Sequence, residues 1–309
     1  MAALRIVSAS VAALVGLSVA CSAGSAAAAP AAKSPRAGRA EGTTASPLRC
    51  SAHRGHTLVY YGGPVEDDGY VNVIYWGSWW SSHGKAIRSE LAHLLSGLSS
   101  SNWAATLRQY CGTSGPPMWT LDLLGAVHID KANPPAAPTS AQFDAEVNKW
   151  IPQPVDADEG TYMIVTPPGT APAFDAGRCG SHGWTSLKAA GDPYYYLPWM
   201  DVPYGIILKT RGCGWNLKQA VAGAVSVVAG HEWAEAMTDP FVNSTKATAG
   251  GSGWATTGRK LNVEVADLCE PDFRLHFIHE NVFVLKLKTG DFVMQKLWSN
   301  AAGKCVDDS

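Results

Sequence analysis

The chain has 309 residues, of which 46% are hydrophobic and 16% are charged. It is therefore long and apolar enough to bury a core, and it is not a disordered tail. Its 31 glycines and 19 prolines follow no period, which excludes a collagen-like chain, and charged heptads of a coiled coil are missing. Lysine and arginine number 24 against 26 acidic residues, so no excess of positive charge is available to neutralise phosphates. We expect no nucleic-acid partner.

The first 29 residues have the pattern of a secretory signal peptide. Arg5 provides a short positive start, residues 6–20 are apolar, and Ala27 to Ala29 are the small residues that precede a cleavage site. The apolar run is too short and too rich in Ala and Ser to span a membrane, which takes about 20 strongly apolar residues. Cleavage after Ala29 leaves 280 residues. We expect a secreted, extracellular protein without stable membrane insertion.

The cysteine count supports export. Removal of Cys21 with the leader leaves six cysteines, an even number that can form three disulfides in an oxidising compartment. No C-x-x-C pair occurs among them, and the sequence leaves their pairing open. Residues 30–49 are small, polar and Pro-containing, which predicts a flexible linker or a pro-segment before a single domain at 50–309.

Within that domain, strand and helix patterns alternate. Short β-branched or aromatic runs indicate strands, and apolar residues at helical spacing indicate helices. In chain order we predict a hairpin or adjacent strand pair at 58–61 and 71–76, helices at 82–98 and 102–110, a strand at 121–129, a helix at 141–150, strands at 162–165 and 204–208, a long helix at 217–238 capped by Asn216 and ended by Asp239-Pro240, and a C-terminal hairpin at 283–287 and 292–297 stapled at its end by Cys305. This alternation predicts a disulfide-stabilised α/β (α+β) sandwich with a central helix.

The strongest chemical signal is His231-Glu232-Trp233-Ala234-Glu235, late in the long helix. Residues four apart share a helix face, so His231 and Glu235 can bind one ion while Glu232 reaches a metal-bound water as general base. The pattern is the H-E-x-x-H zinc-peptidase helix with a glutamate in place of the second histidine, and a carboxylate is an acceptable zinc ligand. We therefore expect a zincin-like domain that acts as a zinc metallopeptidase-like hydrolase on a peptide or protein substrate.

A third ligand has to come from another segment. Glu264 in Glu264-Val265-Ala266-Asp267 is the first choice, and Asp267 and His182 are alternates. Asp239 ends the helix, and a less favoured role for it is to orient His231.

A structural interpretation stands beside the catalytic one. A buried histidine held by a neighbouring glutamate is an ordinary way to satisfy polar groups in a core. In that case the protein is non-catalytic, and its 12 tryptophans and 10 tyrosines offer an aromatic surface for cell-wall polysaccharide or a protein partner. An open cleft beside Glu232 would favour catalysis, and a site sealed by Trp233 or Trp254 would favour the structural role.

Four sequence blocks resemble one family. They are Tyr61-Gly62-Gly63-Pro64 with VNVIYWGSW and IRSELAHLLSGL, then SSSNWAATLRQY, then Cys179-Gly180-Ser181-His182, and finally HEWAEAMTDP through EVADLCE to FVMQKLWSNAAGKCV. In order and spacing they resemble the phosphate-induced, Exordium-like secreted proteins, over nearly the whole mature domain. The resemblance implies an extracellular protein, linked in plants to the cell wall and growth control and without an established enzymatic activity. It also implies that the His/Glu helix and the Glu264 segment form one site.

Overall fold

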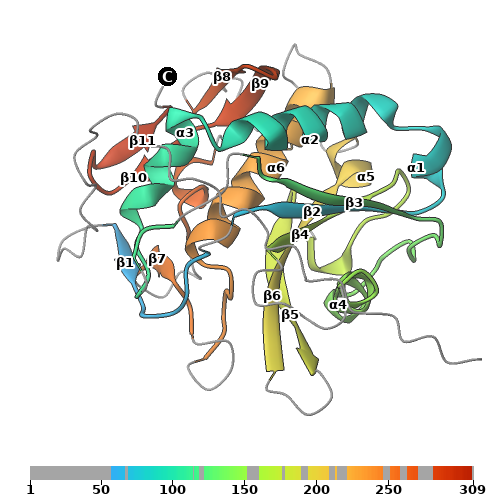
Figure 1. Ribbon diagram of the computed structural model, residues 1–309, viewed down its shortest axis with the longest axis horizontal. Helices are drawn as coiled ribbons and strands as arrows, with labels where there is room; N and C mark the ends of the chain where they lie inside the picture. The colour runs from blue at the N-terminus through green and yellow to red at the C-terminus, as the bar shows by residue number, and fades with distance from the viewer. Residues whose placement is uncertain are drawn as a thin grey trace, which may run out of the picture. The chain divides into compact units, whose positions relative to one another are not determined.

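A five-stranded mixed β-sheet lies at the centre of the computed structural model (Figure 1). The strand order is β3-β2-β4-β6-β5. Strands β3, β2, β4 and β6 run parallel to their neighbours, and the edge strand β5 pairs antiparallel with β6. Their bounds are β2 Val71–Trp76, β3 Leu124–Asp130, β4 Thr161–Thr166, β5 Ser181–Lys188 and β6 Tyr194–Pro203.

The structure describes residues 57–66, 69–113, 115–117, 122–151, 160–175, 178–188, 194–208, 213, 221–245, 251–257, 263–270 and 281–307. They all belong to one compact unit, Ser46–Ser309. The predicted signal peptide at 1–29, the whole predicted linker or pro-segment at 30–49, and the predicted cap Asn216 lie outside the described residues.

Both faces of the sheet are covered, and strand β2 shows why. Successive side chains of a strand point to opposite faces. Val73 and Tyr75 join the core beneath helices α2 (Lys85–Leu98) and α6 (Val221–Thr238), whereas Ile74 and Trp76 join a second core on the side of helix α4 (Ser140–Asn148). All six residues of β2 are buried, as expected for a parallel strand covered on both sides. The result is three layers, with helix on both faces of the sheet.

Helix α6 is the central helix that the sequence predicts. Its first ten residues, VAGAVSVVAG, are apolar almost all round, and such a helix is stable only when it is buried. It packs against β6 of the sheet, against α2, and against β9 (Gly290–Gln295). Its C-terminal half carries the HEWAE motif and ends at Thr238, directly before Asp239-Pro240 as predicted.

The remaining elements surround this core. Strand β1 pairs with β7, β8 pairs with β9, and β10 pairs with β11, each pair antiparallel. The bounds are β1 Leu58–Tyr60, β7 Trp254–Thr256, β8 Val282–Leu287, β10 Leu297–Ser299 and β11 Lys304–Val306, with short helices α1 Trp79–Ser82, α3 Asn102–Ala105, α5 Tyr204–Ile207, η1 Thr106–Gln109, η2 Ala173–Asp175 and η4 Asp267–Cys269.

Three details of the predicted fold are wrong. The strands at 58–61 and 71–76 do not pair, because β1 pairs with the distant β7 and β2 lies inside the large sheet. Residues 204–208 form helix α5 and a turn, and the strand there is β6, which ends at Pro203. Cys305 lies in the β10–β11 pair, so it does not staple the β8–β9 hairpin. Pairing partners of this kind depend on long-range contacts that a local pattern does not contain.

Two disulfides join described residues, Cys179–Cys213 and Cys269–Cys305. Cys111 is also disulfide-bonded. The prediction of a disulfide-stabilised α/β domain is therefore confirmed. Among the described residues, none of the helices has both the length and the apolar character that crossing a bilayer requires.

Candidate metal centre

Two histidines and five acidic residues from three separate segments meet beside the C-terminal half of α6. Helix α6 contributes the three polar residues of its motif, β5 contributes its second residue, and the segment at 263–270 contributes two acidic residues, while Asp239 follows α6 directly. They are His231, Glu232, Glu235, His182, Glu264, Asp267 and Asp239. The structure thus brings together every residue that the sequence analysis selected for the site.

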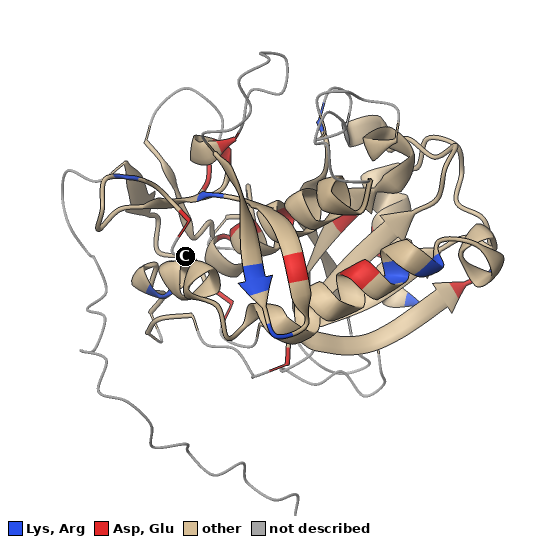
Figure 2. Ribbon diagram, turned by 90° about the horizontal axis from the view of Figure 1, so that it is seen from above, with Lys and Arg blue, Asp and Glu red and all other residues tan. Residues whose placement is uncertain are grey.

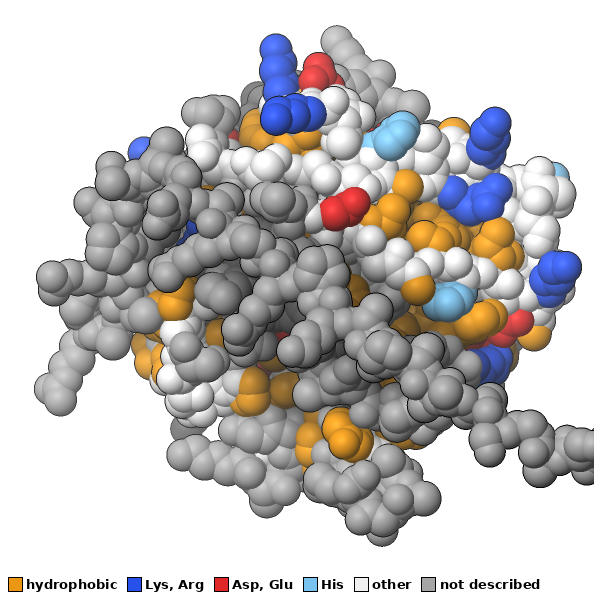
Figure 3. Space-filling model, viewed as in Figure 1, with side chains coloured by type: hydrophobic (Ala, Val, Ile, Leu, Met, Phe, Trp, Pro, Cys, Tyr) orange, Lys and Arg blue, Asp and Glu red, His pale blue; other side chains and the backbone are white. Residues whose placement is uncertain are grey.

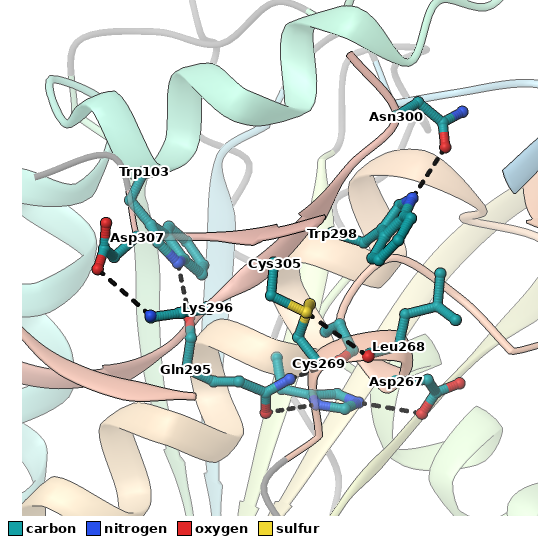
Figure 4. Close-up of a disulfide and its surroundings, with 12 residues drawn as sticks. Trp103, Asp267, Leu268, Cys269, Gln295, Lys296, Trp298, Asn300, Cys305 and Asp307 are labelled. Atoms are coloured by element: carbon teal, nitrogen blue, oxygen red, sulfur yellow. Dashed lines mark hydrogen bonds and ion pairs between the residues drawn. A yellow bond between two sulfur atoms is a disulfide. The ribbon is translucent and has the colours of Figure 1, made fainter. Parts of the chain in front are cut away.

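His231 lies on one side of Glu235. Its Nε2 is 3.2 Å from Glu235 Oε1 and 3.6 Å from Asp267 Oδ1. Its Nδ1 is 3.1 Å from Gln295 Oε1, and Figure 4 shows Gln295 and Asp267 close to the disulfide between Cys269 and Cys305. One ligand atom from each of His231, Glu235 and Asp267 lies within 4.8 Å of the others, a spacing at which one ion can contact all three.

His182 lies on the other side of Glu235. Its Nδ1 is 3.6 Å from Glu235 Oε2 and 3.6 Å from Glu232 Oε2. Its Nε2 faces the backbone carbonyl oxygen of Asp239 at 3.2 Å and Glu264 Oε1 at 3.6 Å. Asp239 therefore contacts His182, and not His231 as the sequence analysis suggested. His182, Glu232 and Glu235 form a second group whose ligand atoms lie within 4.8 Å of one another.

A short turn connects the two acidic residues of the 263–270 segment. The backbone N–H of Glu264 donates to Asp267 Oδ2 at 3.0 Å, and the backbone N–H of Asp267 donates to Glu235 Oε1 at 3.0 Å. These bonds hold Asp267 on the His231 side, while Glu264 points to His182. The segment thus contributes one acidic side chain on each side of Glu235, Asp267 near His231 and Glu264 near His182.

Disulfides anchor the two segments that approach α6. Cys179 precedes His182 by three residues, and Cys269 follows Asp267 by two (Figure 4). Gly180 permits the close approach of β5 to the helix, because a Cβ there would lie 2.7 Å from Glu232 Oε1 and 2.8 Å from Val228 Cγ1. A larger residue would push the strand that carries His182 away from Glu232.

Four of the five carboxylates of this cluster are buried, and none of the five pairs with a lysine or arginine among the described residues. Glu232 and Glu264 are each 4% exposed and Asp239 is fully buried. Among the described residues, the two histidines are the only partners in ion pairs with this cluster, and they pair with four of its acidic side chains, Glu232, Glu235, Glu264 and Asp267. Figure 2 shows lysine and arginine on outer elements such as α2 and the β8–β9 hairpin, whereas α6 carries acidic charge alone.

This environment shifts the proton affinities of the carboxyl groups. Burial, together with the charges of Glu235 and other carboxylates, raises the pKa of Glu264 well above its usual value. Burial also raises the pKa of Glu232 and raises that of Asp239 to about 6. For Asp267 burial acts in the same direction, but the hydrogen bond and charge of His231 outweigh it and lower the pKa.

The pKa values of both histidines are raised, although burial alone would lower them. Burial lowers the pKa of His231, but the charge of Glu235 and the hydrogen bonds to Asp267 and Glu235 outweigh it, and the pKa lies well above its usual value. At His182 burial is likewise outweighed, by Glu232 and Glu235, so the pKa is raised. The cluster therefore favours bound positive charge, either as protons on the histidines or as a cation.

A cavity of about 380 Å³ opens onto the cluster. His182, His231 and Glu232 line it, with Arg178 and Asn243 at other parts of the wall. Neither Trp233 nor Trp254 seals the site, because the indole of Trp233 donates to the carbonyl of Gly69 and that of Trp254 to the carbonyl of Cys111. Within the described part of the chain, Glu232 therefore borders a cavity that neither tryptophan closes.

The sequence does not predict one residue of the site, Gln295, and it predicts His182 and Asp267 only as alternates to Glu264. Gln295, the last residue of β9, lies within hydrogen-bond distance of His231 Nδ1. A glutamine at the end of a strand has no sequence pattern that would predict this role. His182 was only an alternate, because strands β5 and β6 were not predicted. Its position beside Gly180 and a disulfide cysteine is the one local signal that could have favoured it.

No family model, curated protein or solved structure matches this chain. The resemblance to Exordium-like proteins stays a prediction.

Proposed function

We propose that the protein is a secreted metal-dependent hydrolase, most similar in mechanism to zinc metallopeptidases. The observation that carries this proposal is the group of His231 Nε2, Glu235 Oε1 and Asp267 Oδ1 beside an open cavity that Glu232 also lines. The donor set of one imidazole and two carboxylates can bind zinc, and it is harder and less selective for zinc than a set with two imidazoles. Asp267 takes the position of third ligand for which Glu264 was the first choice, because Glu264 is directed to His182. A sheet with a site-bearing helix across one face is also what a zincin-like domain requires.

The buried carboxylates support a cation at this place. Glu232 Oε2, Glu264 Oε1 and Asp239 Oδ2 are buried without a hydrogen-bond partner in the described part of the chain. Unsatisfied buried oxygens are unfavourable, so the arrangement fits a site that binds a positive group.

In the proposed hydrolysis of a peptide bond, the cation and the residues around it would have separate roles. A bound divalent cation supplies Lewis-acid polarisation and makes water more acidic. Glu232 takes a proton from the attacking water and passes it to the amine nitrogen as the peptide C–N bond breaks. Gln295 accepts a hydrogen bond from His231 Nδ1 and so keeps Nε2 directed to Glu235.

Metal content and peptide hydrolysis test the proposal together. The purified mature protein should contain zinc after exhaustive dialysis and cleave an unstructured protein substrate. Glu232→Gln should keep zinc at the His231 position but lose about 10²- to 10⁴-fold in rate, the usual contribution of a general base. His231→Ala should lose that zinc. A folded Glu232→Gln protein as active as the parent would refute the role of Glu232.

A specific observation also favours a binding function. A shallow groove of about 530 Å³ at α1 is lined by Trp79, His83, Asn133 and several prolines, and Trp79 stacks on His83 with ring centroids 5.1 Å apart. On the face in Figure 3, hydrophobic side chains lie between Lys, Arg and His at the end of the molecule that carries α1, α2 and β3. Aromatic rings beside polar groups suit a sugar chain.

That second proposal is a non-catalytic, Exordium-like extracellular protein that binds cell-wall polysaccharide or a protein partner. Trp79→Ala should then abolish retention on insoluble polysaccharide, with Trp184→Ala as the matched control. Retention that survives in Trp79→Ala would exclude this groove as the binding site.

A further inference from the structure

We propose that the site holds two divalent cations bridged by the carboxylate of Glu235, with the second cation bound by His182 and Glu232. The inference rests on the proposed function for its first cation, at His231, Glu235 and Asp267. The structure contains two groups of ligand atoms, each within 4.8 Å, and Glu235 belongs to both.

Glu235 presents one oxygen to each group. Its Oε1 is 3.2 Å from His231 Nε2, and its Oε2 is 3.6 Å from His182 Nδ1. A carboxylate between two imidazoles in this way can bridge two cations, which in two-metal sites lie about 3.5–4 Å apart. A single cation on the His231 side would use only one of these oxygens.

Each histidine directs one ring nitrogen to Glu235 and the other to a carbonyl-type oxygen. A neutral imidazole has one N–H and one nitrogen lone pair. His182 Nε2 lies 3.2 Å from the carbonyl oxygen of Asp239, which can only accept, so its N–H points there and Nδ1 keeps the lone pair toward Glu235. His231 Nδ1 lies 3.1 Å from Gln295 Oε1, and Gln295 is fixed because its amide donates to the carbonyl of Ala266 at 2.5 Å. Such outer hydrogen bonds are typical of histidines that ligate metals.

Glu232 supplies the remaining ligand atom on the His182 side. Its Oε2 is buried, has no hydrogen-bond partner among the described residues, and faces His182 Nδ1 at 3.6 Å. Its Oε1 lies on the side of Gly180, which lines the cavity. Glu232 can therefore bind the second cation through one oxygen and take a proton from the cavity side through the other.

Charge favours two cations over one. When ionised, the five acidic side chains of the cluster carry five negative charges, and no lysine or arginine pairs with them in the described part of the chain. With neutral histidines, one divalent cation leaves three negative charges uncompensated, and two leave one. Uncompensated buried charge is strongly unfavourable.

Zinc stoichiometry tests the inference on the full mature chain. The protein is stripped with chelator, reloaded with zinc chloride, freed of unbound metal and analysed for zinc per chain. We expect two zinc ions in the wild type and in His93→Ala, whose histidine is exposed on α2. We expect one in His182→Ala and one in His231→Ala, and at least tenfold weaker binding of the second zinc in Glu232→Gln, which keeps the side-chain volume.

Manganese gives a readout that does not depend on stoichiometry. Two Mn²⁺ ions bridged by a carboxylate are spin-coupled, so the wild type loaded with manganese chloride should give a coupled electron paramagnetic resonance spectrum. His182→Ala should give the spectrum of an isolated ion. One zinc in the wild type, kept in His182→Ala, would overturn the second site and leave the proposed function intact. No zinc in the wild type would overturn both.

Discussion

Two buried glutamates, Glu146 on α4 and Glu232 on α6, lie on opposite faces of the sheet and differ in their partners. Glu146 is fully buried, and one oxygen forms an ion pair with Lys149 while the other accepts from the indole of Trp150 at 3.0 Å. Lys149 also pairs with Asp130 at 2.9 Å. Glu232 is also buried, yet its Oε2 lacks a hydrogen bond within the described residues, and the charged groups around it are His182, His231 and Glu235.

The comparison separates a carboxylate that pairs with a lysine of the fold from one that, in the proposed function, binds an added cation. The α4 cluster contains its own cation, so the fold alone satisfies it. The α6 cluster has only two histidines against five acidic side chains, so under the proposed function a bound cation adds to its stability. Experiments that remove the ligand should therefore affect one glutamate and not the other.

Metal removal should have the largest effect. A cation present at about 1,000 times its dissociation constant stabilises the folded chain by about 4 kcal/mol, which chelation removes. We expect the free energy of unfolding, measured by urea denaturation, to fall by that amount in EDTA. The double variant His182→Ala/His231→Ala should show no further loss in EDTA, and an equal loss there would place the metal elsewhere.

The chelated protein should become less stable as the pH rises. The pKa of Asp239 is raised from 3.8 to about 6 by burial, so its contribution to stability is complete below pH 3.8 and is lost as the pH rises through about 6. Two pKa units correspond to about 3 kcal/mol. Urea denaturation of the chelated protein at pH 4 and pH 7 measures this, with Asp239→Asn as the comparison. The same slope in Asp239→Asn would show that another group causes it.

Gln295→Ala should weaken the first cation site without touching a ligand. Loss of the outer hydrogen bond to His231 typically costs 10- to 100-fold in metal affinity. Competition with a coloured chelator measures the change at each of the two sites. The His182 side should keep its affinity, because the carbonyl of Asp239 orients that ring. Equal weakening at both sites would mean that Gln295 acts on the fold and not on His231.

The sequence predicted the helices of this fold better than its strand partners. Residues 82–98 and 217–238 have helical spacing or a continuous apolar run, and α2 and α6 occupy most of these spans. Strand β5, in contrast, is SHGWTSLK, which has neither clean alternation nor a β-branched run. It forms because β6 provides its partner along the whole length, and that contact is not local.

The same limit applies to the site. His231, Glu232 and Glu235 lie within five residues of one helix, so spacing alone placed them together. His182 is 53 residues from Glu235 and Gln295 is 64 residues from His231, and only the folded chain shows that they meet. A pairing across such distances requires the register of β5 on β6 and of β9 on β8.

Glu146→Gln should have the smallest effect and is the matched control for Glu232→Gln. Burial raises the pKa of Glu146 even with Lys149 beside it, so the charged form gains little from that pair. Lys149 is 49% exposed and can return to water, and a glutamine can still accept from Trp150. We therefore expect a change of about 1 kcal/mol or less in unfolding free energy, with zinc content unchanged. A loss of zinc in Glu146→Gln would remove the distinction between the two clusters, because any buried glutamate would then affect the metal.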